Sequence, residues 1–329
     1  MAPDLCPHRP CPNRRAFVDS ASDSDATQVL SRSASRSVLR SVRTRWSPCS
    51  TCERPLRDHR GKKYQQARIV ARGHRVRKRG AGRAGYEVSE HSYSLDGQKV
   101  SNLEAILAGS EKESGTLVVG AHYDGVAGTV GADDNATGVA AILELARMLQ
   151  GSRLRKNIRF VLFANDEPPF FQTDVMGSLV YARQLKRDHI EVSAMISLEM
   201  LGYYSDAPSS QKYPALLGWL YPSRGDFLGF VGKSDSPDLV RRAVRRFRET
   251  TDFPSEGVAA PVEWPGVGWS DHWSFWQANY PAIMITDTAI FRNPYYHTPN
   301  DTPDKLDFPR MARVVEGVRR VVETLASNP

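Results

Sequence analysis

The stretch RFVLFANDEPPFF, residues 159–171, joins a short apolar run to two adjacent acids and then to two prolines. A compact apolar run that ends at turn residues is typical of a strand buried on both faces of a sheet. Asp166 and Glu167 then stand at the carboxyl end of this strand, and Pro168 and Pro169 favour a fixed turn directly after them. The pattern therefore predicts a buried strand that delivers two carboxylates to one edge of a sheet.

Other apolar runs resemble this one, and amphipathic helical patterns lie between them. We expect strands at 116–122, 158–164, 194–200, 227–232 and 282–286, and an exposed strand at 86–95 that could pair with 100–107. Helical spacing of apolar residues occurs in 137–150, 176–188, 237–251 and 308–326. Strands that alternate with helices predict an α/β fold, a three-layer α/β/α sandwich around a twisted, mixed and mostly parallel sheet.

The composition of the 329 residues is that of a globular protein, with 40% hydrophobic and 25% charged residues. No uninterrupted apolar run of about 18 residues occurs, so no membrane span is expected. The beginning of the chain also lacks the apolar core of a secretory signal. The default expectation is a cytoplasmic protein, with export possible if the first residues are not the authentic start.

The chain changes composition near Gly85. Residues 1–85 hold 20 Lys and Arg against 6 Asp and Glu, whereas the rest of the chain holds 24 and 31. The first segment is rich in Arg and Ser and has no helical or strand periodicity, so we expect it to be disordered or not the authentic N-terminus. Two domains follow from this: a basic segment at 1–85 and a patterned α/β domain at 86–329.

The composition of the basic segment suggests two special roles. Clustered Arg and Lys can neutralise phosphates, but charge alone is weak evidence, and we expect no nucleic-acid partner. Its four cysteines, Cys6, Cys11, Cys49 and Cys52, could suggest a zinc site, but no apolar framework separates the two pairs. A solvated basic segment is the simpler interpretation.

Potential metal ligands stand at the carboxyl ends of three of the expected strands. His122 ends one, Asp166 and Glu167 end the next, and Glu199 ends a third. Two loops, GADDNATG at 131–138 and YYHTPNDTPD at 295–304, add further acids and a histidine. Each of these alone has an ordinary explanation, such as a helix cap, a turn or a satisfied histidine. Together they gather where α/β folds place their functional groups.

The combination of these residues predicts a pair of zinc ions. Zinc accepts histidine nitrogens and carboxylate oxygens, and two ions that share a bridging carboxylate need about three protein ligands each. The sequence supplies five such ligands: His122, Asp134, Glu167, Glu199 and His297. Asp124 follows His122 by two residues and is placed to accept the other ring N–H of the imidazole.

Six blocks of the chain, GAHYDG, GADDNATGVAAILELAR, FANDEPPF, LEMLGYYSD, SDHWSFW and YYHTPNDT, resemble those of the co-catalytic zinc exopeptidases of the aminopeptidase Y type. Bacterial leucyl aminopeptidases, glutamate carboxypeptidase and the glutaminyl cyclases are relatives. The resemblance runs from about residue 86 to residue 329 and implies the zinc exopeptidase fold, two zinc ions per chain and an aminopeptidase activity on peptides.

The resemblance also implies roles for individual residues. His122 and Glu199 would bind one zinc, Glu167 and His297 the other, and Asp134 would bridge them. Asp134 takes this place ahead of Asp133 because the family's bridging acid lies four residues before the glycine of its block. Tyr296 would stabilise the oxyanion, and Asp166 would be the general base.

Asp166 departs from the family pattern. The base is normally the first Glu of an NEE block, and here the block is NDE. The side chain is one methylene shorter, which removes about 1.5 Å of reach from a base that must lie within hydrogen-bond distance of the proton it takes. A misplacement of about 1 Å can cost a factor of roughly 100 in rate. A shifted metal pair, a relay through a second water, or an impaired enzyme are the three possible consequences.

The segment WPGVGWSDHWSFW, residues 264–276, holds four of the six tryptophans. Such aromatics commonly belong to a core or an interface. Because the segment contains the SDH block, we also expect it to line a substrate pocket for bulky apolar N-terminal residues. The residues predicted for that pocket are Trp269, Asp271, His272 and Trp273.

Two other functions remain open at this point. A glutaminyl cyclase-like acyltransferase would use one zinc, and a non-catalytic binding domain would keep the fold without turnover. The expected partner is a peptide substrate, and the sequence indicates no oligomeric state.

Overall fold

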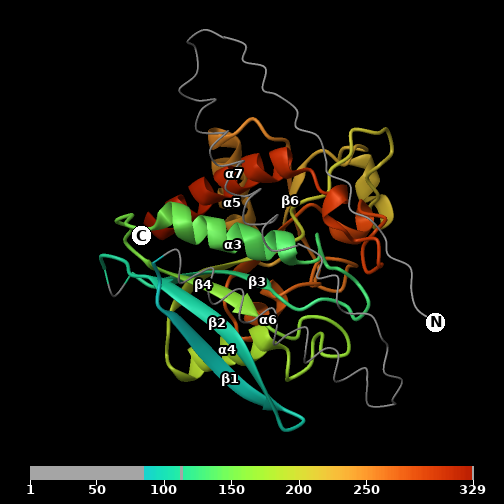
Figure 1. Ribbon diagram of the computed structural model, residues 1–329. Coiled ribbons are helices and arrows are strands. Elements are labelled where there is room, and N and C mark those ends of the chain that lie inside the picture. Colours follow the sequence, from blue (N-terminus) through green and yellow to red (C-terminus); the bar gives the residue numbers. More distant parts are fainter. Residues whose placement is uncertain (1–84, 112–113, 328–329) are drawn as a thin grey trace, which may run out of the picture.

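A computed structural model describes residues 85–111 and 114–327, and Figure 1 shows their arrangement. The basic segment therefore lies outside the described residues, apart from Gly85, and so do its cysteines and the predictions made for them.

The described residues form one eight-stranded sheet in the order β1-β2-β4-β3-β5-β8-β6-β7. Neighbours are parallel at β4/β3, β3/β5, β5/β8 and β6/β7, and antiparallel at the other three pairs. The sheet is therefore mixed and mostly parallel, as expected. The strands are β1 (Val88–Leu95), β2 (Gln98–Leu107), β3 (Thr116–His122), β4 (Asn157–Phe163), β5 (Val192–Glu199), β6 (Leu228–Lys233), β7 (Ser255–Ala260) and β8 (Ala282–Thr286).

The two outer strands β1 and β2 form a hairpin that a two-residue turn closes. Leu95 pairs with Gln98, so Asp96 and Gly97 make the turn, and both have positive φ angles, 50° and 77°. An Asp-Gly pair with positive φ at both positions is the sequence that tight hairpins favour, because its twist matches that of the strands. Strand β3, in contrast, lies in the middle of the sheet, and all seven of its residues are buried.

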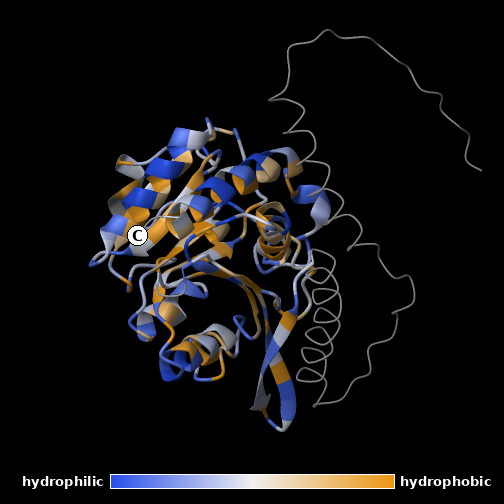
Figure 2. Ribbon diagram, turned by 90° about the vertical axis from the view of Figure 1, so that its left-hand side faces the viewer, coloured by the Kyte–Doolittle hydropathy of each residue, from blue (hydrophilic) through white to orange (hydrophobic). Residues whose placement is uncertain are grey.

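Helices cover both faces of the sheet, which gives the predicted three layers (Figure 1). One face carries α3 (Ala136–Leu149), α5 (Pro237–Thr250) and α7 (Phe308–Ser327), and the other carries α4 (Gly177–Arg187) and α6 (His272–Gln277). Each face has its own hydrophobic cluster: Leu117 and Val119 of β3 belong to the first, and Val118 to the second. Figure 2 shows hydrophobic residues concentrated on the strands and the helix faces turned towards them.

Strand β7 and helix α6 were not predicted from the sequence. The β7 segment, SEGVAA, holds a glycine and two alanines and shows no alternation, so its pairing with β6 depends on tertiary contacts. Helix α6 has only six residues, too few for a helical periodicity to appear. In the described ranges, none of the helices has the length and hydropathy that a membrane crossing requires.

Candidate metal centre

The strand order explains why the acids and histidines of the sequence meet. Strands β4, β3 and β5 are parallel neighbours, so their carboxyl ends lie at one edge of the sheet. His122 is the last residue of β3 and Glu199 the last of β5, while Asp166 and Glu167 follow β4 closely. The crevice at this edge is where α/β folds place their ligands.

A first group of possible ligands consists of His122, Asp134 and Glu199, all of them buried. The Nε2 atom of His122 lies 3.5 Å from Asp134 Oδ1 and 3.3 Å from Glu199 Oε2. Asp134 comes from the loop before α3, so a loop and two strand ends together form this group.

A second group consists of Asp134, Glu167 and His297. The Nε2 atom of His297 lies 3.1 Å from Asp134 Oδ2 and 3.3 Å from Glu167 Oε2. Asp134 thus turns one carboxylate oxygen to each group, which is the arrangement of a bridging ligand.

The chemistry of these two groups fits divalent zinc. Glu167 Oε1 and His297 Nε2 are buried and make no hydrogen bond within the described residues. Burial, and next the charge of Asp134, raises the pKa of Glu167 to about 8. A cation held among these groups would stabilise the ionised carboxylates and give the unpartnered atoms a ligand, since buried charges are stable only when they are paired or coordinated. Imidazole nitrogens and carboxylate oxygens are ligands that zinc accepts.

Asp124 lies between the end of β3, which carries His122, and the turn after β4, which carries Asp166 and Glu167. Its Oδ1 lies 3.6 Å from Nδ1 of His122. The same carboxylate accepts hydrogen bonds of 3.1 Å from the backbone N–H groups of Asp166 and Glu167. Asp124 therefore fixes the turn after β4 by hydrogen bonds and lies beside the ring of His122, and the sequence did not indicate the turn contacts.

Asp301 fixes the loop before α3 by accepting hydrogen bonds from backbone N–H groups, as Asp124 does for the turn after β4. Its two oxygens accept hydrogen bonds from the backbone N–H groups of Asp133, at 2.9 Å, and Asp134, at 3.1 Å. The side chain of Asp133 points elsewhere and accepts hydrogen bonds from Asn293 Nδ2, at 2.7 Å, and from the N–H of Gly202, at 2.9 Å. Asp301 was not singled out from the sequence. The available signal was that Asp301 belongs to the same block, YYHTPNDT, as the predicted ligand His297.

Two further polar residues that the sequence did not single out contact Glu199. Ser270 Oγ donates a hydrogen bond of 2.7 Å to Glu199 Oε2 and lies 2.8 Å from Ser197 Oγ. Asn135 Nδ2 donates to the same carboxylate oxygen at 3.3 Å and to the Leu198 carbonyl at 2.9 Å. These contacts fix the rotamer of Glu199 at the edge of the sheet.

Asp166 lies inside the same acidic cluster. Its Oδ2 is 3.8 Å from His122 Nε2, and its Oδ1 is buried without a hydrogen-bond partner in the described residues. Burial raises the pKa of Asp166 well above its ordinary value; the charge of His122 opposes this, and the neighbouring Asp271 adds to it. A carboxyl group with a raised pKa inside a crevice is a candidate for proton transfer.

Tyr296 stacks on the ring of His297, with 3.8 Å between ring centroids and an angle of 19° between the planes. Burial, followed by the charges of Asp134 and Glu167, raises the pKa of its hydroxyl, so the phenol keeps its proton over the working pH range. Tyr296 and Glu199 both line a cavity of about 110 Å³ that begins beside the predicted centre.

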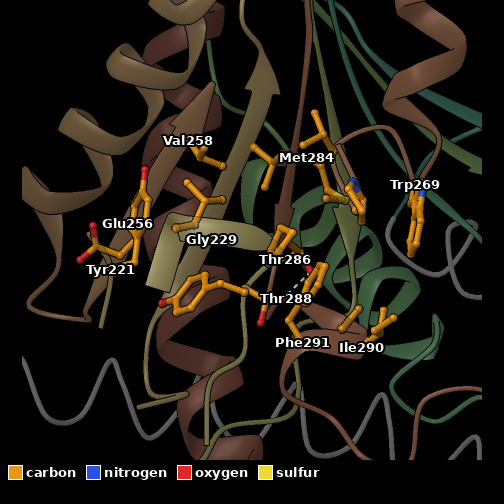
Figure 3. Close-up of a pocket in the computed structure, with 18 of the residues that line it drawn as sticks. Tyr221, Gly229, Glu256, Val258, Trp269, Met284, Thr286, Thr288, Ile290 and Phe291 are labelled. Atoms are coloured by element: carbon orange, nitrogen blue, oxygen red, sulfur yellow. Dashed lines mark hydrogen bonds between the residues drawn. The ribbon is translucent and has the colours of Figure 1, made fainter. Parts of the chain in front are cut away.

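Trp269 is the one predicted pocket residue that lines this cavity, and Figure 3 shows it at one side of the opening. The other three residues do not line this cavity. Asp271 and His272 are fully buried, and His272 Nε2 lies 2.7 Å from the Val267 carbonyl oxygen. Trp273 packs against the hydrophobic cluster under α4 and α6. The short helix α6 turns these side chains into the protein, which the block SDHW did not reveal.

Comparison with known proteins gives a consistent result. The model of peptidase family M28 matches residues 102–322. The uncharacterised protein YfbL of Escherichia coli K12 is 46% identical over 211 residues, which make up 61% of this chain and 64% of that protein. A probable leucine aminopeptidase of Arthroderma otae is 29% identical over 237 residues, 68% of this chain and 56% of that protein. The chain thus spans less than two thirds of the length of these curated relatives.

Solved structures share the fold at low sequence identity. The LapA aminopeptidase of Legionella pneumophila aligns with a TM-score of 0.65 and 20% identity, over 96% of this chain and 78% of that one. The glutaminyl cyclase of Porphyromonas gingivalis aligns with a TM-score of 0.57 and 19% identity, over 89% of this chain and 98% of that one. Since an aminopeptidase and a cyclase share the fold, the fold does not separate these two activities.

Proposed function

The chain belongs to peptidase family M28, and from this premise we propose that it is a zinc-dependent aminopeptidase, a hydrolase that removes N-terminal residues from peptides. The observation that carries the proposal is Asp134, which turns one oxygen to each of two groups of possible ligands. This arrangement supports two zinc ions per chain, one held by His122, Asp134 and Glu199, the other by Asp134, Glu167 and His297.

Bound zinc would supply a Lewis acid that polarises a carbonyl group and makes a water molecule easier to deprotonate. Side chains of the protein would carry out the proton transfers and stabilise the developing charge. Asp166 would take the proton from the attacking water and return it to the leaving amine, the work of a general base and then a general acid. Its place beside His122, with one carboxylate oxygen unpartnered, supports that role.

Tyr296 would donate a hydrogen bond to the oxygen that gains charge as the water attacks. Its raised pKa favours the protonated phenol that such a donor needs. The stacking on His297 limits the movement of the ring, so the donor is oriented before the substrate arrives. The products would be an amino acid and a shortened peptide.

The cavity beside Glu199 and Tyr296 supports a preference for large side chains with an apolar body at the N-terminus of the substrate. Its lining is mostly apolar, with Phe227, Val231 and Met284 among the contributors. An apolar side chain that enters such a cavity gains about 25 cal/mol for each Å² of surface removed from water.

The experiment compares a short peptide with a free N-terminus and its N-acetylated form, using the zinc-loaded full chain and mass spectrometry of the products. Stepwise loss of N-terminal residues from the free peptide alone is the expected result. Cleavage of neither peptide would contradict the proposal. A peptide with N-terminal Gln provides the second test, because loss of ammonia without shortening would assign a glutaminyl cyclase instead.

A further inference from the structure

The floor of the cavity is built from residues of four neighbouring strands, β5, β8, β6 and β7. In the row nearest the predicted centre, Glu199 of β5 pairs with Thr286 of β8, Thr286 with Gly229 of β6, and Gly229 with Glu256 of β7. All four residues line the cavity. Because residues opposite one another in a sheet point to the same face, Glu199 and Glu256 stand at the two ends of one row.

A second row lies behind the first and is apolar. Met284 of β8 pairs with Val231 of β6, and Val231 with Val258 of β7; all three line the cavity. Figure 3 shows the resulting arrangement, with Trp269 at one side, Glu256 and Tyr221 at the other, and Gly229 and Thr286 between them. The cavity is therefore an apolar passage that leads from the predicted centre to a carboxylate.

The length of the passage follows from the sheet. Strands β5, β8, β6 and β7 are consecutive neighbours, so Glu199 and Glu256 lie three strand spacings apart. At about 4.8 Å for each spacing, this amounts to about 14 Å. Gly229 keeps the middle open, because an added Cβ there would stand 3.3 Å from Thr288 Cγ2 and fill the floor.

One carboxylate stands among the aromatic walls at the far end of the passage. Tyr213 and Tyr221 stack with 5.9 Å between ring centroids, and their hydroxyls donate to the carbonyls of Pro222 and Gly257. Their polar groups are thus occupied by the backbone. Glu256 is the acid among the lining residues at this end.

We propose that Glu256 is a specificity-determining residue that selects substrates with Arg or Lys at the N-terminus. This inference rests on the proposed aminopeptidase function and refines its substrate class. An Arg side chain extends three atoms beyond the end of a Leu side chain, with an apolar stem and a cationic tip. The stem matches the apolar rows, and the tip reaches the end where a carboxylate and two aromatic rings can bind a cation.

Cations near the passage limit the size of the effect. Arg248 lies on the outer side, in a groove over α5, and its Nη2 is 3.3 Å from Glu256 Oε2. Lys212 also lines the cavity, but its ammonium donates to the Ser209 carbonyl at 3.1 Å. The carboxylate of Glu256 is also about one third exposed, with a side-chain exposure of 32%. Screening by water and by Arg248 therefore keeps the expected selectivity near the lower end for a charged hydrogen bond.

The test compares the anilides of arginine and citrulline, which have the same shape and differ in charge, with the zinc-loaded full chain. We expect kcat/KM for the arginine substrate to be about tenfold higher, which corresponds to about 1.4 kcal/mol. The variant Glu256→Gln should hydrolyse the arginine and citrulline anilides with equal kcat/KM. The variant Arg248→Gln should increase the ratio, because it removes the competing cation.

The outcomes separate this inference from the function on which it rests. If no anilide is cleaved, the proposed aminopeptidase function fails. If the leucine anilide is cleaved but arginine and citrulline substrates are equivalent, or Glu256→Gln leaves their ratio unchanged, the assignment of Glu256 is overturned. Zinc content, measured on each variant, should be the same throughout, since neither residue is among the proposed ligands.

Discussion

Asp124 Oδ2 accepts a hydrogen bond of 3.1 Å from the backbone N–H of Glu167. A residue just beyond β3 thus holds the turn after β4 at the point where that turn presents a proposed zinc ligand. Without this contact, the orientation of Glu167 would depend on the turn alone. The acidic pair that ends the buried strand owes its position to a third acid from the neighbouring strand.

Replacing Asp124 by asparagine should weaken zinc binding about 10- to 100-fold, the usual effect of losing a residue that orients metal ligands. The amide can accept with only one atom, so one of the two backbone N–H groups would lose its partner. Competition with a chromogenic chelator measures the affinity. Asp174→Asn is the matched control, because the side chain of Asp174 is 84% exposed and pairs with Arg183 on the surface. Equal zinc affinity in both variants would contradict this role for Asp124.

Replacing Asp166 should separate catalysis from metal binding. Asp166→Asn should lower kcat by about 10²- to 10⁴-fold, the contribution typical of a general base, with zinc content unchanged. Asp166→Glu should be faster than the unaltered protein, because the longer side chain restores the reach of the usual glutamate. Steady-state hydrolysis of leucine anilide, with zinc measured in parallel, provides the readout. A slower Asp166→Glu variant with full zinc would show that our account of the base is wrong.

Ser270→Ala should weaken one zinc site selectively. The hydroxyl of Ser270 donates to Glu199 Oε2 at 2.7 Å, and a hydrogen bond to a charged group contributes about 1.5–3 kcal/mol. We therefore expect the affinity of the site with His122 and Glu199 to fall at least about tenfold, while the other site keeps its zinc. Ser274→Ala is the control, since Ser274 is equally buried and contacts Ser178 instead. Loss of both zinc ions together, or of neither, would disagree with this assignment.

Much of this architecture could be predicted because it depends on local patterns. The apolar runs of β3, β4, β5, β6 and β8 marked buried strands, and their ends carried His122, Glu167 and Glu199. Burial on both faces leaves a strong signal in sequence, and parallel neighbours bring their carboxyl ends together without further information.

The rest could not be predicted because it depends on contacts between distant segments. Asp301 binds the backbone N–H of a residue 167 positions away, and Ser270 reaches Glu199 across 71 positions. Neither pairing has a local signature. The direction of Asp271 and His272 was missed for the same reason, since a helix as short as α6 has no periodicity from which a buried face could be inferred.

A buried ion network away from the centre predicts a pH dependence of stability. Glu104 Oε1 accepts hydrogen bonds from Arg159 Nη1, at 2.6 Å, and from the Tyr181 hydroxyl, at 3.0 Å. Burial alone would raise the pKa of Glu104, but hydrogen bonding with His91 and the charge of Arg159 lower it below its ordinary value of 4.5. The ionised form therefore stabilises the folded protein above pH 4.5, and this contribution disappears as the pH falls through the lowered pKa.

The variant Glu104→Gln should be less stable by about 3 kcal/mol at pH 7, because it leaves the guanidinium of Arg159 without its partner. Below pH 4.5 the difference should shrink. Urea unfolding at several pH values measures it. Glu111→Gln, which breaks the exposed pair with Arg155, should cost less than about 1 kcal/mol. A Glu104→Gln deficit that is constant from pH 7 to pH 3 would contradict the assignment.

The central claim, that Asp134 bridges two zinc ions in an aminopeptidase, is tested most directly by titrating the metal-free full chain with zinc while following hydrolysis of leucine anilide. The account predicts activity that rises until two equivalents of zinc per chain are bound and then stays constant. Saturation at one equivalent, or no hydrolysis at any zinc concentration, would contradict it.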